Sequence, residues 1–185
     1  MKPYLSIITP CYNAEKFIED AICSVLGQKS DWIEHILVDD GSVDHTPEIC
    51  RRYESESVKY VRTDNLGAGH ARNVGMSFAR GTWIAFLDGD DLFLENSISD
   101  QLKIKLEKYE SDGIDLVFTA RSRTDMDRTS VELTEAARPE QIEHHIPELE
   151  FWTYLYRKDA LVAGNVRFYE YRRQDIESAF RYKAC

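Results

Sequence analysis

The chain contains the stretch Trp83-Ile84-Ala85-Phe86-Leu87-Asp88-Gly89-Asp90-Asp91, in which an apolar run typical of a buried strand ends in closely spaced carboxylates. Carboxylates at this density repel one another, and burying them without a partner would be very costly. Oxygen ligands of this kind suit a hard divalent ion such as Mg²⁺ or Mn²⁺. A solvated and inert acidic turn is the simpler alternative, because an isolated Asp-x-Asp motif often arises by chance.

A second acidic strand end argues against that alternative. It is Ile36-Leu37-Val38-Asp39-Asp40-Gly41-Ser42. The first half of the chain alternates strand and helix patterns, which predicts an α/β fold with a mainly parallel sheet. The expected strands span 5–9, 33–38, 58–62 and 82–87, and the expected helices span 14–28, 46–53 and 67–80. Ligands of such sheets bind beyond the carboxyl ends of the strands, where both acidic clusters are expected.

Local signals set some of these boundaries. Pro10 is expected to end the first strand, and Asn13 is expected to cap the first helix. The second half of the chain is less regular. Helices are expected over 95–111, 158–162 and 173–182, strands over 114–119 and 151–156, and a hairpin or loops over the polar residues 121–150. The chain ends directly after the last of these helices, which indicates a C-terminal truncation.

Composition limits the classes of function. A length of 185 residues is enough for one domain with a sizeable core. A net charge of −10 argues against nucleic acid as a partner, and it requires that any anionic ligand be held by local cations. The sequence shows neither a signal peptide nor a run long enough for an integral membrane segment. The cysteines lack the spacing of a zinc site. These features together predict a cytoplasmic protein with reduced thiols.

Four motifs together resemble glycosyltransferase family 2, whose members have the GT-A fold. They are Ser6-Ile7-Ile8-Thr9-Pro10-Cys11-Tyr12-Asn13, Val38-Asp39-Asp40-Gly41-Ser42, Asn65-x-Gly67 with Ala71-Arg72-Asn73-x-Gly75, and Phe86-Leu87-Asp88-Gly89-Asp90-Asp91. Their order makes the resemblance specific over roughly the first hundred residues. Further on, Gln174-Asp175 is similar to a Glu-Asp pair of the family, with Gln in place of Glu.

The resemblance implies the transfer of a sugar from a nucleotide-diphospho-sugar, usually a UDP-sugar, to an acceptor hydroxyl with inversion. It implies that residues 1–118 form the nucleotide-sugar-binding half and residues 119–185 the acceptor-side half of one GT-A domain. The acceptor would be a saccharide or a lipid-linked molecule in the synthesis of surface polysaccharide or another glycoconjugate. Any association with the inner face of the membrane would be peripheral.

The resemblance also assigns roles to single residues. The predicted substrate-binding residues are Pro10, Tyr12, Asp39, Asp40, Arg72, Asp88 and Asp90. The predicted ligands of a divalent metal, Mn²⁺ or Mg²⁺, are Asp91 and Asp90, with Asp91 as the first candidate. Contact with the ribose is the alternative role of Asp90. Asp88 would orient the loop or the waters of the metal. Asp175 is the predicted catalytic base, with Glu177 as a possible substitute.

The residue types suit these roles, although each also has a simpler explanation. The ring of Tyr12 can stack on a base, or it can belong to the core. Asp39 and Asp40 can accept hydrogen bonds from uracil and ribose, with Asp40 as the base contact by resemblance, or they can form an ordinary turn. Arg72 can bind phosphate oxygens near a helix start, or it can lie on a solvated helix face.

Other functions make different demands on the sequence. A catalytically silent nucleotide-sugar-binding module of a larger assembly is the main alternative, and Gln174 favours it. A nucleotidyltransferase would need a glycine-rich basic loop where this chain has Pro10-Cys11-Tyr12-Asn13. A dinucleotide-binding dehydrogenase is excluded, because no G-x-G-x-x-G motif follows the first expected strand.

Overall fold

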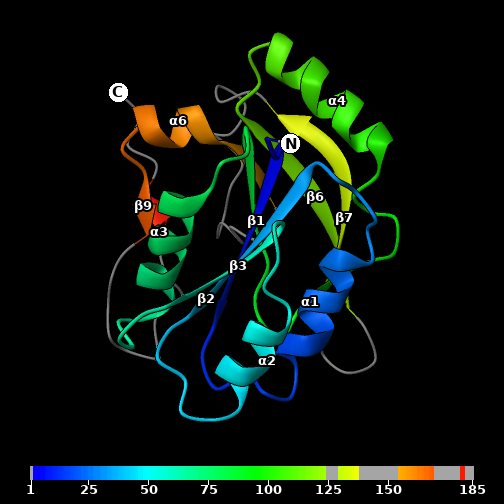
Figure 1. Ribbon diagram of the computed structural model, residues 1–185. Coiled ribbons are helices and arrows are strands. Elements are labelled where there is room, and N and C mark those ends of the chain that lie inside the picture. Colours follow the sequence, from blue (N-terminus) through cyan, green and yellow to red (C-terminus); the bar gives the residue numbers. More distant parts are fainter. Residues whose placement is uncertain (1, 124–128, 138–153, 169–179, 182–185) are drawn as a thin grey trace.

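A computed structural model describes residues 2–123, 129–137, 154–168 and 180–181 (Figure 1). The strands are β1 (Leu5–Cys11), β2 (Ile33–Asp39), β3 (Val58–Arg62), β4 (Trp83–Phe86), β5 (Leu92–Phe93), β6 (Leu116–Arg123), β7 (Thr129–Ala137), β8 (Tyr154–Arg157), β9 (Arg167–Phe168) and β10 (Phe180–Arg181). The helices are α1 (Ile18–Leu26), α2 (Thr46–Arg52), α3 (Ala68–Phe78), α4 (Asp100–Ser111) and α6 (Lys158–Ala163). In the described residues the main sheet has the order β3-β2-β1-β4-β8-β6-β7-β5, and β10 and β9 form a separate pair.

The first four strands form the parallel part of the sheet, as the alternating pattern predicted. β1 lies in the middle and pairs with β2 from Leu5↔Ile33 to Cys11↔Asp39. On its other side β1 pairs with β4, and β3 pairs in parallel with β2. The carboxyl ends of these strands therefore meet at one edge of the sheet, and both acidic motifs follow strands that end there.

β8, β6 and β7 extend the sheet in the antiparallel sense, and β5 then pairs with β7 in parallel at the edge. β8 pairs antiparallel with β4 and β6, and β6 pairs with β7 as a hairpin. This hairpin confirms one of the two structures expected for the polar region 121–150, of which residues 124–128 and 138–150 lie outside the described residues. The helix expected over 173–182 is wrong at its end, because Phe180 and Arg181 pair with β9 as a strand. Residues 173–179 lie outside the described residues.

Helices cover both faces of the sheet because side chains alternate along each strand. On one face, Ile7 of β1 belongs to an apolar cluster with Ala21 of α1 and Leu106 of α4. On the opposite face, the neighbouring Ile8 belongs to a cluster with Ala71 of α3 and Leu161 of α6. Figure 1 shows α3 on one side of the sheet, and α1 and α2 on the other.

Two local expectations are corrected at the end of β1. The strand continues through Pro10 to Cys11. The bond from Leu87 N–H to the carbonyl of Ile8 is the last one toward β4, so the missing N–H of Pro10 interrupts no ladder on that side. The first helix begins at Ile18, and Asn13 is not its cap: the N-cap residue is Phe17, and Asn13 has a positive φ of 49°.

The predicted division between residues 118 and 119 falls within β6, so the two halves share one sheet. The division itself stays a prediction. None of the helices in the described part of the chain combines the length and the apolar character that a bilayer crossing requires.

Candidate active site

A cleft of about 430 Å³ opens at the carboxyl ends of β1, β2 and β4. This is the edge at which parallel sheets usually bind ligands, and the volume is typical of small-molecule sites. The cleft is lined by Pro10, Cys11, Tyr12, Asn13, Ala14, Phe17, Asp40, Ala68, Arg72, Asp88, Gly89 and Asp90. Every predicted substrate-binding residue except Asp39 is therefore part of its lining.

The remaining predicted residues lie elsewhere. Asp39 and Asp91 are not among the residues that line the cleft. Asp175 and Gln174 lie outside the described residues, as does Glu177, so the position of the catalytic base stays a prediction.

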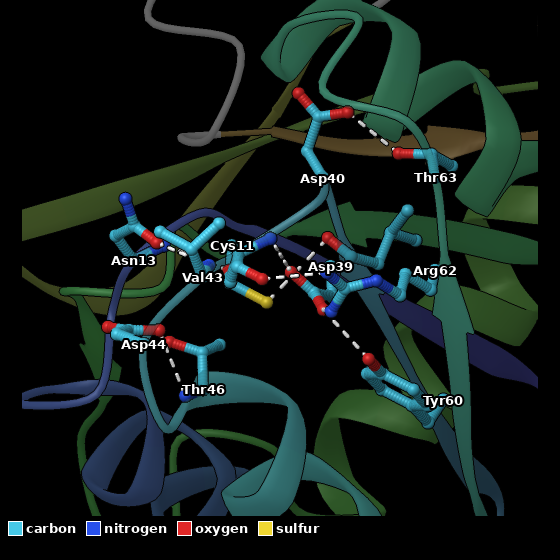
Figure 2. A network of polar contacts seen from close by, with 12 residues as sticks. Cys11, Asn13, Asp39, Asp40, Val43, Asp44, Thr46, Tyr60, Arg62 and Thr63 are labelled. Atoms are coloured by element: carbon cyan, nitrogen blue, oxygen red, sulfur yellow. Dashed lines mark hydrogen bonds and ion pairs between the residues drawn. The ribbon is translucent and has the colours of Figure 1, made fainter.

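Asp39 uses its carboxylate inside the protein (Figure 2). Its Oδ1 accepts a hydrogen bond from Ser42 N–H at 2.8 Å. Its Oδ2 accepts from Tyr60 Oη at 2.7 Å and from Arg62 Nη1 at 2.6 Å. Burial, together with the bond to Asp39, raises the pKa of Tyr60 to about 12, so the hydroxyl keeps its proton and remains a donor. Asp39 thus ties the end of β2 to β3, and a direct contact with the nucleotide stays a prediction.

Asp40 points away from Asp39 and toward the loop after β3 (Figure 2). Its Oδ1 accepts bonds from Thr63 Oγ1 at 2.7 Å and from Leu66 N–H at 2.9 Å. Its Oδ2 accepts from Gly67 N–H at 2.7 Å. These donors hold the carboxylate at the cleft in a fixed orientation, and the side chain is almost fully buried.

Arg72 brings a positive charge to the cleft from α3. Its Nη2 donates to Asp88 Oδ1 at 2.8 Å, and the side chains are 6% and 28% exposed, respectively. The guanidinium also lies over the ring of Phe168, with 5.4 Å between its central carbon and the ring centroid. α3 begins at Ala68, which is itself part of the cleft lining, so the positive end of the helix dipole reaches the same place.

The acidic turn after β4 fits a metal shared with a ligand better than a metal enclosed by the protein. In the described residues no group of three His, Cys, Asp or Glu side chains comes together to hold a metal ion. Metal–nucleotide sites usually take only one or two carboxylates from the protein and the other oxygens from phosphate and water. Asp90 is exposed on the cleft, Asp91 follows it directly in the chain, and Asp88 pairs with Arg72.

Aromatic and thiol groups complete the lining. Tyr12 and Phe17 are each 43% exposed, which leaves their rings accessible to a ligand. Phe17 falls within the helix expected over 14–28, whereas in the structure it is the N-cap residue of α1 and lines the cleft, which no sequence signal shows. The contact of Cys11 with the Cys50 thiol and its burial raise the pKa of Cys11, so Cys11 stays protonated and serves as an apolar part of the lining.

Comparison with known sequences decides the family. The family model described as glycosyl transferase family 2 matches residues 6–173. The chain belongs to glycosyltransferase family 2. The glycosyltransferase EpsJ of Bacillus subtilis (strain 168) is 35% identical over 199 residues, which cover 100% of this chain and 56% of EpsJ. TuaG of the same strain, whose name refers to teichuronic acid biosynthesis, is 42% identical over 110 residues, which cover 58% of this chain and 44% of TuaG.

Solved structures of other glycosyltransferases share the fold. Residues 1–349 of TarS from S. aureus, in complex with UDP, match with a TM-score of 0.63 at 24% identity, covering 90% of this chain and 50% of that one. The mannosyltransferase PcManGT from Pyrobaculum calidifontis, in complex with GDP-Man and Mn²⁺, matches with a TM-score of 0.64 at 19% identity, covering 88% and 47%. This confirms the predicted GT-A fold. The chain spans about half the length of the curated relatives it matches.

Proposed function

We propose that this family 2 chain transfers a sugar from a UDP-sugar to an acceptor hydroxyl with inversion, in surface polysaccharide or glycoconjugate synthesis. The observation that carries the proposal is the set of hydrogen bonds that the Asp40 carboxylate accepts at the cleft. A carboxylate has about four lone-pair positions, and three of those on Asp40 already accept bonds from Thr63, Leu66 and Gly67. One position is left for a ligand donor, and the accessible ring of Tyr12 lines the same cleft.

This count of acceptor positions favours uracil over guanine. The Watson–Crick edge of uracil has a single N–H donor, whereas guanine offers adjacent N–H and NH₂ donors that require two acceptors. The remaining acceptor position of Asp40 can pair with the N–H of uracil. With guanine, one of the two donors would stay unpaired, which is costly in a buried site. The UDP complex of TarS, a neighbour in fold, is consistent with this preference, and the GDP-Man complex of PcManGT shows that the fold also admits guanine.

The diphosphate of the donor would lie between Arg72, the start of α3 and the acidic turn. Arg72 can donate to phosphate oxygens and stabilise the charge that develops on the leaving UDP. A divalent metal would be held by Asp90 and Asp91 and would supply further positive charge to the leaving diphosphate. These cations would allow a protein with a net charge of −10 to bind an anionic diphosphate.

The acceptor side of the proposal depends on residues outside the described part of the chain. Inversion requires a base opposite the leaving group, and Asp175 remains the predicted base. A saccharide or lipid-linked acceptor is supported by the name of TuaG, which refers to teichuronic acid biosynthesis. Work on such an acceptor would bring the protein to the inner face of the membrane as a peripheral partner.

Calorimetric titration with UDP and with GDP, each with and without Mn²⁺, tests the proposal. We expect UDP to bind more tightly than GDP, and Mn²⁺ to strengthen UDP binding in the wild type. The Asp90→Asn and Asp91→Asn variants should lose most of the Mn²⁺ effect, while Asp112→Asn, at the far end of α4, should keep it. Equal binding of UDP and GDP would contradict the role given to Asp40.

Turnover separates the enzyme from the catalytically silent module. With UDP-sugars as substrates and water or a saccharide as acceptor, the wild type should release UDP and Asp175→Asn should not. Tight UDP binding without release of UDP from any UDP-sugar would favour the binding module instead.

A further inference from the structure

Two loops meet beside the cleft: the β1–α1 loop (residues 12–17) and the β2–α2 loop (residues 40–45). Asn13 joins them twice (Figure 2). Its main-chain N–H donates to Ser42 Oγ at 2.9 Å, and its side-chain Oδ1 accepts from Val43 N–H at 2.9 Å. Asn13 of the β1–α1 loop therefore donates one hydrogen bond to the β2–α2 loop and accepts one from it.

Further bonds extend this junction toward α2. Glu15 N–H donates to Asp44 Oδ2 at 3.1 Å, and His45 N–H donates back to Glu15 Oε2 at 3.0 Å. Ala14 N–H donates to the buried Thr46 Oγ1 at 2.8 Å. We call the bonds between residues 13–15 and residues 42–46 the loop clasp. Burial raises the pKa of Asp44, but the bonds from Thr46 and Glu15 outweigh it and hold that pKa below its usual value, so Asp44 stays charged at neutral pH.

The β2–α2 loop is the fixed partner in the loop clasp. Both polar main-chain atoms of Ser42 are held, because its N–H donates to Asp39 and its carbonyl accepts from Arg62 Nη2 at 2.7 Å. Gly41 has a φ of 79°, and a Cβ there would lie 2.9 Å from Asn65 N. The loop is therefore packed tightly against the chain that follows β3, and the β1–α1 loop is bound to this support.

We propose that Asn13 is a positioning residue, which holds the neighbouring Tyr12 in the orientation that receives the nucleobase. The inference rests on the proposed function, in which Tyr12 stacks on the base. Because Tyr12 is 43% exposed, core packing alone does not fix its ring. The loop clasp fixes the main chain of the next residue instead. The φ of 49° at Asn13 lies in the left-handed region, which Asn adopts more readily than most residues.

The test compares three variants, with uridine and UDP as the probes. Asn13→Gly permits the same φ but deletes the acceptor of Val43 N–H, whereas Asn13→Asp permits the φ and keeps an acceptor oxygen. Asn13→Gly should bind uridine about three- to tenfold more weakly, the loss expected for one hydrogen bond. Asn13→Asp should bind uridine as the wild type does, and uridine is used for this comparison because it carries no phosphate to repel the added charge. Val43→Ala is the matched control, since Val43 gives only its main-chain N–H and its side chain is 85% exposed.

Three further readouts separate positioning from a general loss of stability. The amide of Val43 should exchange its hydrogen faster in Asn13→Gly than in Asn13→Asp. In Asn13→Gly the affinity for UDP should fall by the same factor as the affinity for uridine, because the substitution affects the binding of the base. A lower melting temperature of Asn13→Gly with unchanged uridine binding would overturn the inference and leave the proposed function standing. Failure of the wild type to bind either probe would overturn both.

Discussion

The side-chain amide of Asn73 pairs with the main chain of Phe168 through both of its polar atoms. Nδ2 donates to the carbonyl of Phe168 at 3.0 Å, and Oδ1 accepts from its N–H at 2.9 Å. This pairing ties α3 to β9. The ring of Phe168 in turn packs edge-on against Phe86 and lies beneath the guanidinium of Arg72. Arg72 is thus held between Asp88 on one side and Phe168 on the other.

Asn73→Ala should loosen Phe168 and weaken the hold on Arg72. We expect UDP binding to weaken about five- to thirtyfold, which corresponds to the loss of one or two hydrogen bonds of about 1 kcal/mol each. Uridine binding should stay unchanged, because Arg72 is expected to act on the diphosphate. Calorimetry with both ligands measures the difference. An equal loss for uridine and UDP would contradict this account, since it would indicate damage to the whole cleft.

Asp88→Asn should destabilise the protein without ligand. The Arg72 side chain is only 6% exposed, and Asp88→Asn removes one charged hydrogen-bond partner of this nearly buried cation, so a loss of about 1–3 kcal/mol is expected. Urea unfolding measures this loss.

The control is Asp115→Asn. Asp115 pairs with Arg157 at the longer distance of 3.3 Å, with side chains 31% and 24% exposed, so its loss should stay below about 1 kcal/mol. Similar losses in the two variants would show that the burial of Arg72 does not set the strength of its ion pair.

Gly75→Ala tests the close approach of α3 to the sheet. A Cβ at this position would lie inside van der Waals contact of Ile8 Cγ2, which is a stiff, branched side chain in the centre of β1. Overpacking of this kind costs about 1–3 kcal/mol, and it outweighs the gain in helix propensity, which is about 1 kcal/mol at most. The exposed Ser77→Ala on the same helix should change the unfolding free energy by less than about 0.5 kcal/mol. A Gly75→Ala protein as stable as the wild type would show that α3 can shift away from β1.

The sequence predicts the parallel part of this fold because local rules and the global arrangement agree there. The apolar runs before Asp39 and Asp88 are buried strands, and the carboxyl ends of parallel strands necessarily share an edge. The cleft residues Tyr12, Asp40, Arg72 and Asp90 come from four separate segments that this edge brings together. Their convergence follows from the topology alone.

Other features depend on contacts that no local pattern encodes. Asp39 and Asp40 are adjacent carboxylates, and only the positions of Tyr60 and Arg62 on β3 decide that Asp39 turns inward. Pro10 remains within β1 because β4 ends before reaching it. Asn13 reads as a helix cap in sequence, whereas its real partners, Ser42 and Val43, follow a different strand.

His35 should make the stability of the protein depend on acidity. It lies buried in β2, where its Nε2 is 2.8 Å from Thr9 Oγ1, and burial lowers its pKa from 6.5 to about 3. The unfolded chain therefore takes up this proton first as the pH falls. The stability that the neutral His35 contributes to the folded protein is fully present above pH 6.5. It is lost between pH 6.5 and about pH 3, and the free energy of unfolding then falls with a limiting slope of about 1.4 kcal/mol per pH unit.

Urea unfolding of the wild type at pH 7, 6, 5 and 4 measures this slope, and His35→Gln isolates the contribution of the imidazole. Gln can still bond to Thr9 but does not titrate, so its stability should fall less steeply below pH 6.5. The carboxylates titrate in both proteins, and their effect cancels in the comparison. His45→Gln, which alters an exposed histidine, should keep the wild-type slope. Equal slopes for the wild type and His35→Gln would mean that His35 becomes charged in the folded protein at an ordinary pKa.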